Sequence, residues 1–348
     1  MQADRSIPTL DDVAKAADVS TATVSRCLNL PERVAKTTLD RVLKAVKDLG
    51  YTPNFGARVM AARRTFTIGA IIPTMENAIF ARGLQAFQEE LRSHGYTLLV
   101  SSSSYQPDVE KDQINALVAR GADGLLLIGY DREPEIYKYL EQQKVPVLIA
   151  WAFSQDHGQP SIGFDNRNSM CGLADQVIAL GHQHIGVISG ITDGNDRASQ
   201  RLEGIRDAIQ KAGNNPSDLT VIETDFGIQN GANALDKLLQ ASPRPTAVMC
   251  GNDVLAVGAL RRAKELGIDV PTDLSITGFD DIELAQIVTP ALTTVHVPHR
   301  EMGRKAATEL VEMVELRSNG VSIQLDTFLQ LRSSLGPASG QPHKFETE

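Results

Sequence analysis

The sequence contains few of the features that cross-link a protein or anchor it in a membrane. Its three cysteines, Cys27, Cys171 and Cys250, are too few and too far apart for a disulfide framework or a zinc cluster. The longest apolar runs, at 124–129 and 145–152, are far shorter than the roughly 20 residues that span a bilayer. The N-terminal residues include an acid and no apolar signal segment. We therefore expect a cytoplasmic protein with no membrane contact.

Motifs of common enzyme classes are absent as well. No G-x-S-x-G, G-x-x-x-x-G-K-[ST] or H-E-x-x-H occurs in the chain. His182 and His184 have no carboxylate at metal-ligand spacing, so we expect them in a surface turn. The serines of 101–104 could bind a phosphate, but four serines are weak evidence. The sequence therefore predicts no enzyme activity, no metal and no cofactor.

Charge is divided unevenly along the chain. Residues 1–64 hold eleven Lys and Arg against seven Asp and Glu, a net charge of +4, whereas the whole chain carries −9 and the remainder therefore −13. A basic segment joined to an acidic remainder indicates that the segment alone meets a polyanion, although a short segment also reaches such a charge by chance.

The basic segment predicts three short helices. A capping-box pair, Thr9 and Asp12, starts the first helix near residue 10. After a tight turn, Ser20 caps a second helix that runs to about residue 28. A third helix is expected over 36–49, where Gly50 ends it. This arrangement is typical of a helix-turn-helix unit, which either contacts DNA or binds another protein.

From residue 65 onwards, short apolar strands alternate with amphipathic helices. The strands are expected at 67–72, 96–100, 124–128 and 145–150, and then at 184–189, 220–224, 247–250 and 275–279. The helices are expected at 79–94, 108–120, 133–143, 200–212, 230–239 and 254–266. This alternation predicts parallel sheets covered by helices, and its restart after about 100 residues predicts two similar lobes.

Ligands of such sheets bind at the carboxyl ends of the strands, which face one another across a cleft between two lobes. The strand ends here, at 101–105 and 190–201 among others, are rich in hydroxyl, amide, Asp and Arg groups. Such groups, with aromatic faces for stacking, suit a polyhydroxylated or heterocyclic ligand. Ordinary structural roles are equally open: Phe226 in a core, Arg201 on a solvated helix face and Asp280 as a helix cap.

The stretch TLDDVAKAADVSTATVSRCLN at 9–29, followed by LGYTPN and ARVM, resembles the lactose/galactose repressor (LacI/GalR) family of bacterial transcription regulators. RLEG at 201–204, GNDVLAVGAL at 251–260 and SITGFDD at 275–281 resemble the same family, so the resemblance covers nearly the whole chain. It implies an all-α helix-turn-helix domain joined to an α/β periplasmic-binding-protein-like domain of two parallel-sheet lobes.

The resemblance also implies DNA-contacting positions. Those on the second helix, which read bases or contact phosphates, are Thr21, Ala22, Ser25, Arg26 and Asn29. Ala57 and Met60 belong to an implied hinge helix at about 54–62, and Met60 stands where the family usually has a leucine that wedges into the minor groove. Methionine is unbranched and apolar, so it can still unstack a base step.

An effector site between the lobes is implied in the same way. Its expected residues are Phe80, Trp151, Arg201, Phe226, Asn252 and Asp280, with Arg201 and Asp280 as the paired polar anchors. Ala150 and Val297 replace an Asp and a Gln that are common in the family, so the resemblance does not identify the effector. We expect a sugar or sugar acid, with a purine base as the alternative.

Together, these observations predict an effector-controlled transcription regulator, expected to act as a repressor, that binds a palindromic operator as a homodimer. The expected boundaries are 1–62 for the DNA-binding domain, 65–337 for the effector domain and 338–348 for a disordered tail without a leucine heptad. Within the effector domain, lobe one is expected at 65–163 and 296–324 and lobe two at 164–292 and 325–337. Two other classes stay open: a sugar-binding protein whose first domain binds a protein partner, and a sugar-processing enzyme.

Overall fold

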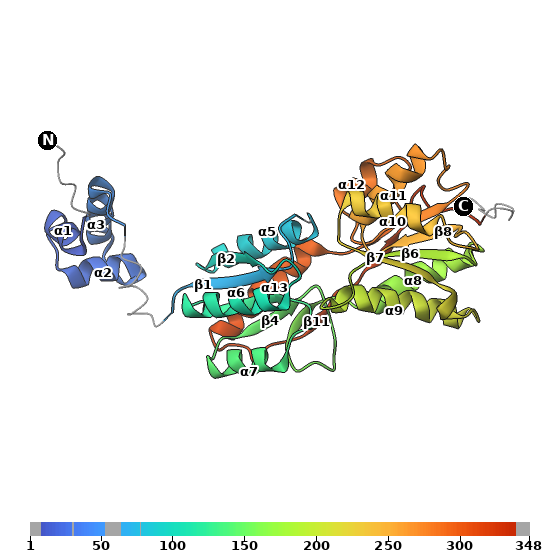
Figure 1. Ribbon diagram of the computed structural model, residues 1–348. Coiled ribbons are helices and arrows are strands. Elements are labelled where there is room, and N and C mark those ends of the chain that lie inside the picture. Colours follow the sequence, from blue (N-terminus) through green and yellow to red (C-terminus); the bar gives the residue numbers. More distant parts are fainter. Residues whose placement is uncertain (1–7, 30, 53–63, 77, 339–348) are drawn as a thin grey trace. The chain divides into compact units, whose positions relative to one another are not determined.

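The computed structural model describes residues 8–29, 31–52, 64–76 and 78–338, and it divides the chain into two compact units, residues 1–65 and 66–348 (Figure 1). In the described part of the chain, no helix has both the length and the apolar character needed to cross a membrane.

The first unit contains the three expected helices. They are α1 (Leu10–Ala16), α2 (Thr21–Asn29) and α3 (Lys36–Leu49), with a 3-10 turn, η1 (Pro31–Arg33), between the last two. The capping box is confirmed, because the Thr9 backbone N–H donates to Asp12 Oδ2 at 2.9 Å and the Asp12 N–H donates to Thr9 Oγ1 at 3.3 Å. Gly50 ends α3 in the left-handed conformation, with φ 64°. Buried side chains from all three helices, among them Val13, Val24 and Val42, form the core.

The second unit begins with a six-stranded parallel sheet in the order β11-β5-β4-β3-β1-β2. Its strands are β1 (Thr67–Ile72), β2 (Thr97–Ser102), β3 (Gly124–Ile128), β4 (Val147–Ala150), β5 (Ser161–Gly163) and β11 (Ile323–Gln324). Helices α5 (Ala78–Ser93) and α13 (His299–Val314) share one apolar cluster with the sheet, and α6 (Pro107–Ala119) and α7 (Pro134–Gln142) share another. Alternate residues of the strands enter the two clusters, as the two-residue period of a strand requires. We call this sheet and its helices the first lobe.

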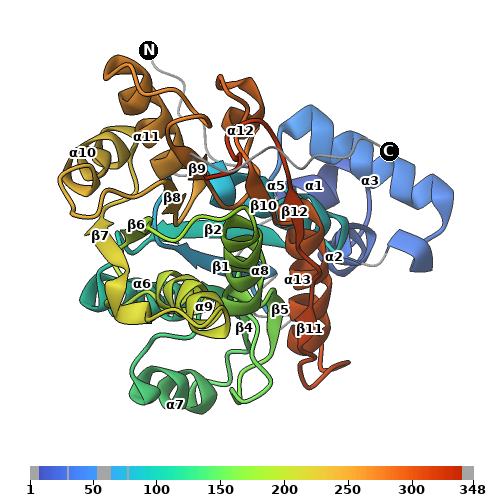
Figure 2. The same cartoon turned by 90° about the vertical axis from the view of Figure 1, so that its right-hand side faces the viewer.

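A second, four-stranded parallel sheet has the order β7-β6-β8-β9. Its strands are β6 (Ile185–Gly190), β7 (Thr220–Thr224), β8 (Ala247–Cys250) and β9 (Ser275–Thr277). Helices α8 (Asn166–Ala179) and α9 (Asp196–Lys211) lie on one side of it, and α10 (Ile228–Leu238) and α11 (Asp253–Glu265) lie on the other (Figure 2). Short elements complete this second lobe: η2 (Pro216–Asp218), α12 (Glu283–Ile287) and the antiparallel pair β10 (Thr294–His296) and β12 (Phe328–Gln330).

The chain passes between the two lobes three times. It leaves the first lobe after β5, returns from β10 to α13, and leaves again from β11 to β12. Most expected elements of both lobes lie within one or two residues of the observed ones, but α9 begins at Asp196, four residues before its expected start. Helices α8 and α13 were not expected from the sequence. Ala338, the first residue of the predicted tail, is buried and donates its N–H to the Leu180 carbonyl at 2.9 Å, and the rest of that tail lies outside the described residues.

Candidate functional site

Helix α2 presents a small polar and basic surface. Thr21, Ala22 and Arg26 are exposed, and Ser25 is partly buried, whereas Val24 faces the core. The Ser20 hydroxyl accepts the Thr23 N–H at 3.2 Å and so caps the helix beside this surface. Of the five positions on α2 that are expected to contact DNA, four therefore have side chains that the structure describes.

The remaining expected DNA contacts cannot be placed in the same way. Asn29 is the last residue of α2. Ala57 and Met60, with the whole expected hinge helix, lie outside the described residues. Their roles stay predictions.

Arg201 and Asp280 meet inside the second lobe. Arg201 lies in the second turn of α9, and its Nη2 is 3.5 Å from Asp280 Oδ1. Arg201 Nε donates to Asn166 Oδ1 at 2.8 Å, and its Nη1 donates to the Gly251 carbonyl at 2.7 Å. The guanidinium carbon lies 3.8 Å from the centre of the Phe279 ring. Arg201 is therefore a buried, fixed donor rather than a solvated helix residue.

Asp280 is fully buried, and neither of its carboxyl oxygens accepts a hydrogen bond from the described residues. Burial raises the pKa of Asp280 to about 7, against the opposing effect of the Arg201 charge. Asn252 Nδ2 and Trp151 Nε1 are also buried without a hydrogen-bond partner among the described residues. A buried polar group without a hydrogen-bond partner costs about 1–3 kcal/mol of folding free energy. Three such groups at one place indicate a site where a ligand can supply the missing hydrogen bonds.

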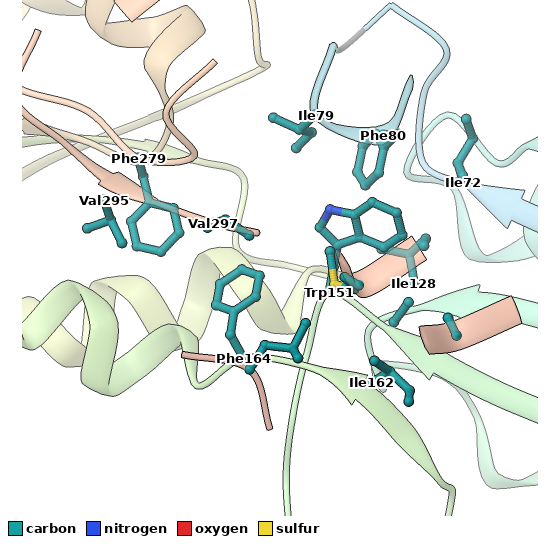
Figure 3. Close-up of a cluster of buried hydrophobic side chains, with 14 of the residues drawn as sticks. Ile72, Ile79, Phe80, Ile128, Trp151, Ile162, Phe164, Phe279, Val295 and Val297 are labelled. Atoms are coloured by element: carbon teal, nitrogen blue, oxygen red, sulfur yellow. The ribbon is translucent and has the colours of Figure 1, made fainter. Parts of the chain in front are cut away.

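Aromatic rings surround this polar centre. Phe80 and Trp151 have ring centroids 5.5 Å apart, and Figure 3 shows the indole beneath the Phe80 ring. Tyr105 of the first lobe lies against Phe226 of the second lobe, with centroids 5.7 Å apart. A cavity of about 30 Å³, the inner pocket, is lined by these four rings, Arg201, Asn252 and seven other residues. The inner pocket brings together five of the six expected effector residues, and the sixth, Asp280, pairs with Arg201.

Two larger cavities adjoin the inner pocket. The outer cavity, about 560 Å³, shares Tyr105, Asn195 and Phe226 with it. The lateral cavity, about 770 Å³, shares Arg197 with it and is lined mainly by 130–132, 152–157 and 165–167. The inner pocket holds about one water molecule. A ligand of sugar size therefore needs the lobes to separate or the rings between the cavities to move.

Sequence reasoning did not single out three residues of this site. Tyr105 and Arg197 fall within the expected strand-end segments 101–105 and 190–201, but nothing in their spacing separates them from their neighbours. Asn195 caps α9, and its Oδ1 accepts the Ala198 N–H at 3.4 Å. Burial raises the pKa of Tyr105 to about 12, which keeps its hydroxyl protonated.

The expectation for His182 is wrong. Its ring is buried, with Nδ1 2.9 Å from Thr246 Oγ1 and Nε2 2.9 Å from the Gly336 carbonyl oxygen. Burial lowers the pKa of His182, so the neutral ring joins the loop before β6 to the C-terminal segment. In the described ranges, no group of three His, Cys, Asp or Glu residues is placed to hold a metal ion.

Comparison with known proteins shows the same two parts. Residues 9–54 match the model of bacterial regulatory proteins, lacI family, and residues 174–335 match a periplasmic binding protein-like domain. The HTH-type transcriptional repressor CytR of Escherichia coli is 34% identical over 328 residues, which cover 94% of this chain and 96% of CytR.

Solved structures agree with this comparison. The lac repressor dimer bound to operator and the anti-inducer ONPF superposes with a TM-score of 0.83 at 26% identity, covering 95% of this chain and 100% of that one. A complex of the transcriptional regulator CelR with cellobiose gives a TM-score of 0.68 at 27% identity, covering 94% of this chain and 99% of the other.

Proposed function

This chain belongs to the lacI family of bacterial regulatory proteins and is a DNA-binding transcription repressor; on that premise, we propose that a sugar or sugar acid bound between its two lobes controls its affinity for a palindromic operator. The repressor acts as a homodimer and, because its partner is the bacterial chromosome, in the cytoplasm. The assignment of residues 1–62 to DNA binding and 65–337 to effector binding is part of this proposal.

One observation carries the effector proposal: the inner pocket joins the fixed donors of Arg201 to polar atoms of Asn252 and Trp151 that have no hydrogen-bond partner among the described residues. The Asp280 carboxyl, which accepts no hydrogen bond there either, lies beside Arg201. Sugar hydroxyls both donate and accept hydrogen bonds, so a sugar can pair with all of these groups. Phe226 and Phe80 supply flat apolar faces for the ring of the ligand.

The charges of the inner pocket favour a ligand rich in acceptors. Arg197 and Arg201 line it, and no carboxylate does. A planar guanidinium donates two parallel hydrogen bonds to a carboxylate, so a sugar acid fits this lining well. A purine base remains the second candidate, because the tilted Tyr105–Phe226 pair could accept a planar ring between its faces.

For DNA, we propose that Thr21, Ala22 and Arg26 contact bases in the major groove and that Ser25 and Asn29 contact phosphates. Exposure of the first three on one short helix supports this assignment. Ala57 and Met60 are proposed to contact the minor groove from the hinge segment.

Two measurements test the function. Full-length protein should select a palindromic sequence from a pool of random DNA and retard it, whereas residues 65–348 alone should not. A thermal-shift screen of sugars, sugar acids and nucleobases should find a ligand that raises the melting temperature of wild-type protein and not of Asp280→Asn. Equal stabilisation of both proteins would place the effector elsewhere.

A further inference from the structure

The start of helix α9 in the second lobe contacts the end of strand β3 in the first lobe. Asp196 Oδ2 accepts the Tyr130 N–H at 2.7 Å, and Arg197 Nη1 donates to the Ile128 carbonyl at 3.0 Å. Within the pair, Arg197 Nη1 also donates to Asp196 Oδ1 at 2.7 Å. Two adjacent side chains of one lobe therefore hold the main chain of the other lobe on both sides of Gly129.

Gly129 shows how closely the two lobes approach here. Its φ is +72°, in the left-handed region, and a Cβ atom at this position would collide with the Arg197 guanidinium and the Asp196 carboxylate. Only glycine leaves room for the pair to reach the strand end. The contact therefore depends on a residue from each lobe.

Arg197 is buried, and its ion pair with Asp196 lies within the second lobe, whereas an ion pair that joins the two lobes is exposed. Arg82 of α5 and Glu283 of α12 are 3.1 Å apart, but their side chains are 41% and 84% exposed. Exposed ion pairs contribute about 0–1 kcal/mol, because water screens them. The buried contact at β3 is therefore the stronger of these two polar connections between the lobes.

The Ile128 carbonyl accepts a second hydrogen bond besides the one from Arg197. Arg132 of the first lobe donates to the same oxygen at 2.9 Å, and its Nη2 pairs with Glu110 at 2.8 Å. The carbonyl therefore keeps a donor when Arg197 leaves it. Arg197 in turn lines the inner pocket, where a ligand can offer it another acceptor.

We propose that Asp196 and Arg197 form a latch that holds the two lobes closed without effector, and that the effector takes Arg197 from the Ile128 carbonyl when it binds. The second half of this statement rests on the proposed effector site, whereas the latch itself does not. When the effector binds Arg197, the hydrogen bond from Arg197 to the first lobe is lost. Binding of the effector therefore weakens the contact between the lobes.

The fluorescence of one tryptophan can report whether the two lobes are closed. Trp151 is the single tryptophan of the chain, is 2% exposed, and lines the inner pocket at the first lobe. Opening the cleft exposes the indole to small solutes. Quenching of its fluorescence by acrylamide in full-length, effector-free protein therefore measures the open fraction.

The latch is tested from both of its sides. Asp196→Ala and Arg197→Ala remove it from the second lobe, and Gly129→Ala obstructs it from the first, so each should raise the quenching constant at least about twofold. Gly95→Ala is the matched control, because Gly95 has φ +78° but open space around its missing Cβ. Arg82→Gln controls for the exposed ion pair. Both controls should quench like wild type.

Three results would overturn the latch: quenching unchanged in all three latch variants, an increase in Gly95→Ala equal to that in Gly129→Ala, or an equal increase in Arg82→Gln. Circular dichroism and urea unfolding of each variant separate opening from loss of the fold. No effector enters the experiment, so failure of the latch and failure of the effector site are distinguishable. An effector screen without any binder would leave the quenching result intact.

Discussion

Arg201 has structural partners that any experiment on effector binding must take into account. Replacing it with alanine leaves Asn166 Oδ1 and the Gly251 carbonyl without this donor, and it leaves Asp280 without its cation. Removal of one partner of a buried ion pair typically costs about 3–5 kcal/mol. These contacts indicate that Arg201→Ala loses stability as well as effector binding.

We therefore predict that Arg201→Ala lowers the free energy of unfolding by about 3–5 kcal/mol, measured by urea denaturation at pH 8, above the raised pKa of Asp280. Arg206→Ala on the same helix is the control. Arg206 pairs with Glu203 at 2.6 Å on an exposed surface, so its loss should cost less than about 1 kcal/mol. Equal losses in the two variants would mean that the buried contacts of Arg201 contribute no special stability.

Burial of Asp280 predicts that the stability of the protein depends on pH. Folding raises the pKa of its carboxyl from 3.8 to about 7, so the folded state keeps a proton that the unfolded chain releases. This group therefore makes the protein less stable as the pH rises from about 4 to about 7, with no further change above that range. Asparagine cannot ionise and removes this dependence.

We expect the free energy of unfolding of Asp280→Asn to increase relative to that of wild type between pH 5 and pH 8, so that the variant becomes the relatively more stable protein. Burial and the charge of Asp280 raise the pKa of Asp253, so Asp280→Asn also lessens the shift at Asp253, and this change acts in the same direction. Asp225→Asn, which removes an exposed carboxylate, is the control. A difference for Asp280→Asn that does not vary with pH would place the ionised form of Asp280 in the folded protein at pH 5.

At the scale of elements, α2 carries the prediction for DNA recognition. Arg26 is exposed on α2, and an arginine in the major groove is the commonest partner of guanine. Arg26→Ala should relax base preference at one symmetric position of the operator, by about 1–3 kcal/mol per site, in a binding-site selection. Arg41→Ala, an exposed arginine of α3, should keep the selected motif. An unchanged motif in Arg26→Ala would remove that residue from the base-reading set.

The elements also show where sequence patterns suffice. Strands β1, β3, β7 and β8 were predicted with their observed bounds, because each is a short run with clear limits. Helix α8 was missed although its buried residues recur at helical spacing on one face, because that face begins with the polar Asn166 and the exposed face carries the small residues Gly172 and Ala179. The early start of α9 follows from the Asn195 cap, and that shift places Arg197 on a rigid helix rather than in a loop.

The sequence predicted only some residues of the candidate site. Arg201, Asn252 and Asp280 lie within motifs of the family, so the sequence names them without any geometry. Arg197 matters because of its contact with the main chain of Ile128, and main-chain carbonyls leave no mark in a sequence. Contacts between the lobes therefore had to come from the structure.

At the scale of the whole molecule, the edge of the first sheet predicts the assembly. Among the described strands, β2 is an edge strand of the first sheet, because it pairs only with β1. Leu99 and Val100 on this strand are each 37% exposed. An edge strand with exposed apolar residues is a site for pairing with another chain. A two-fold symmetric operator requires two copies of α2, and the lac repressor binds its operator as a dimer.

We predict that wild type sediments as a dimer and that Leu99→Asp weakens dimerisation by at least about 2 kcal/mol, roughly 30-fold, because a charge would be buried at the interface. Operator affinity should fall with it, since a monomer engages one half-site. Leu316→Asp is the matched control, because Leu316 follows α13 and is already 86% exposed. Sedimentation velocity and operator titration over the same concentrations measure both effects. If Leu99→Asp remains a dimer with full operator affinity, the interface lies on another face of the effector domain, and β2 is an edge that solvent alone covers.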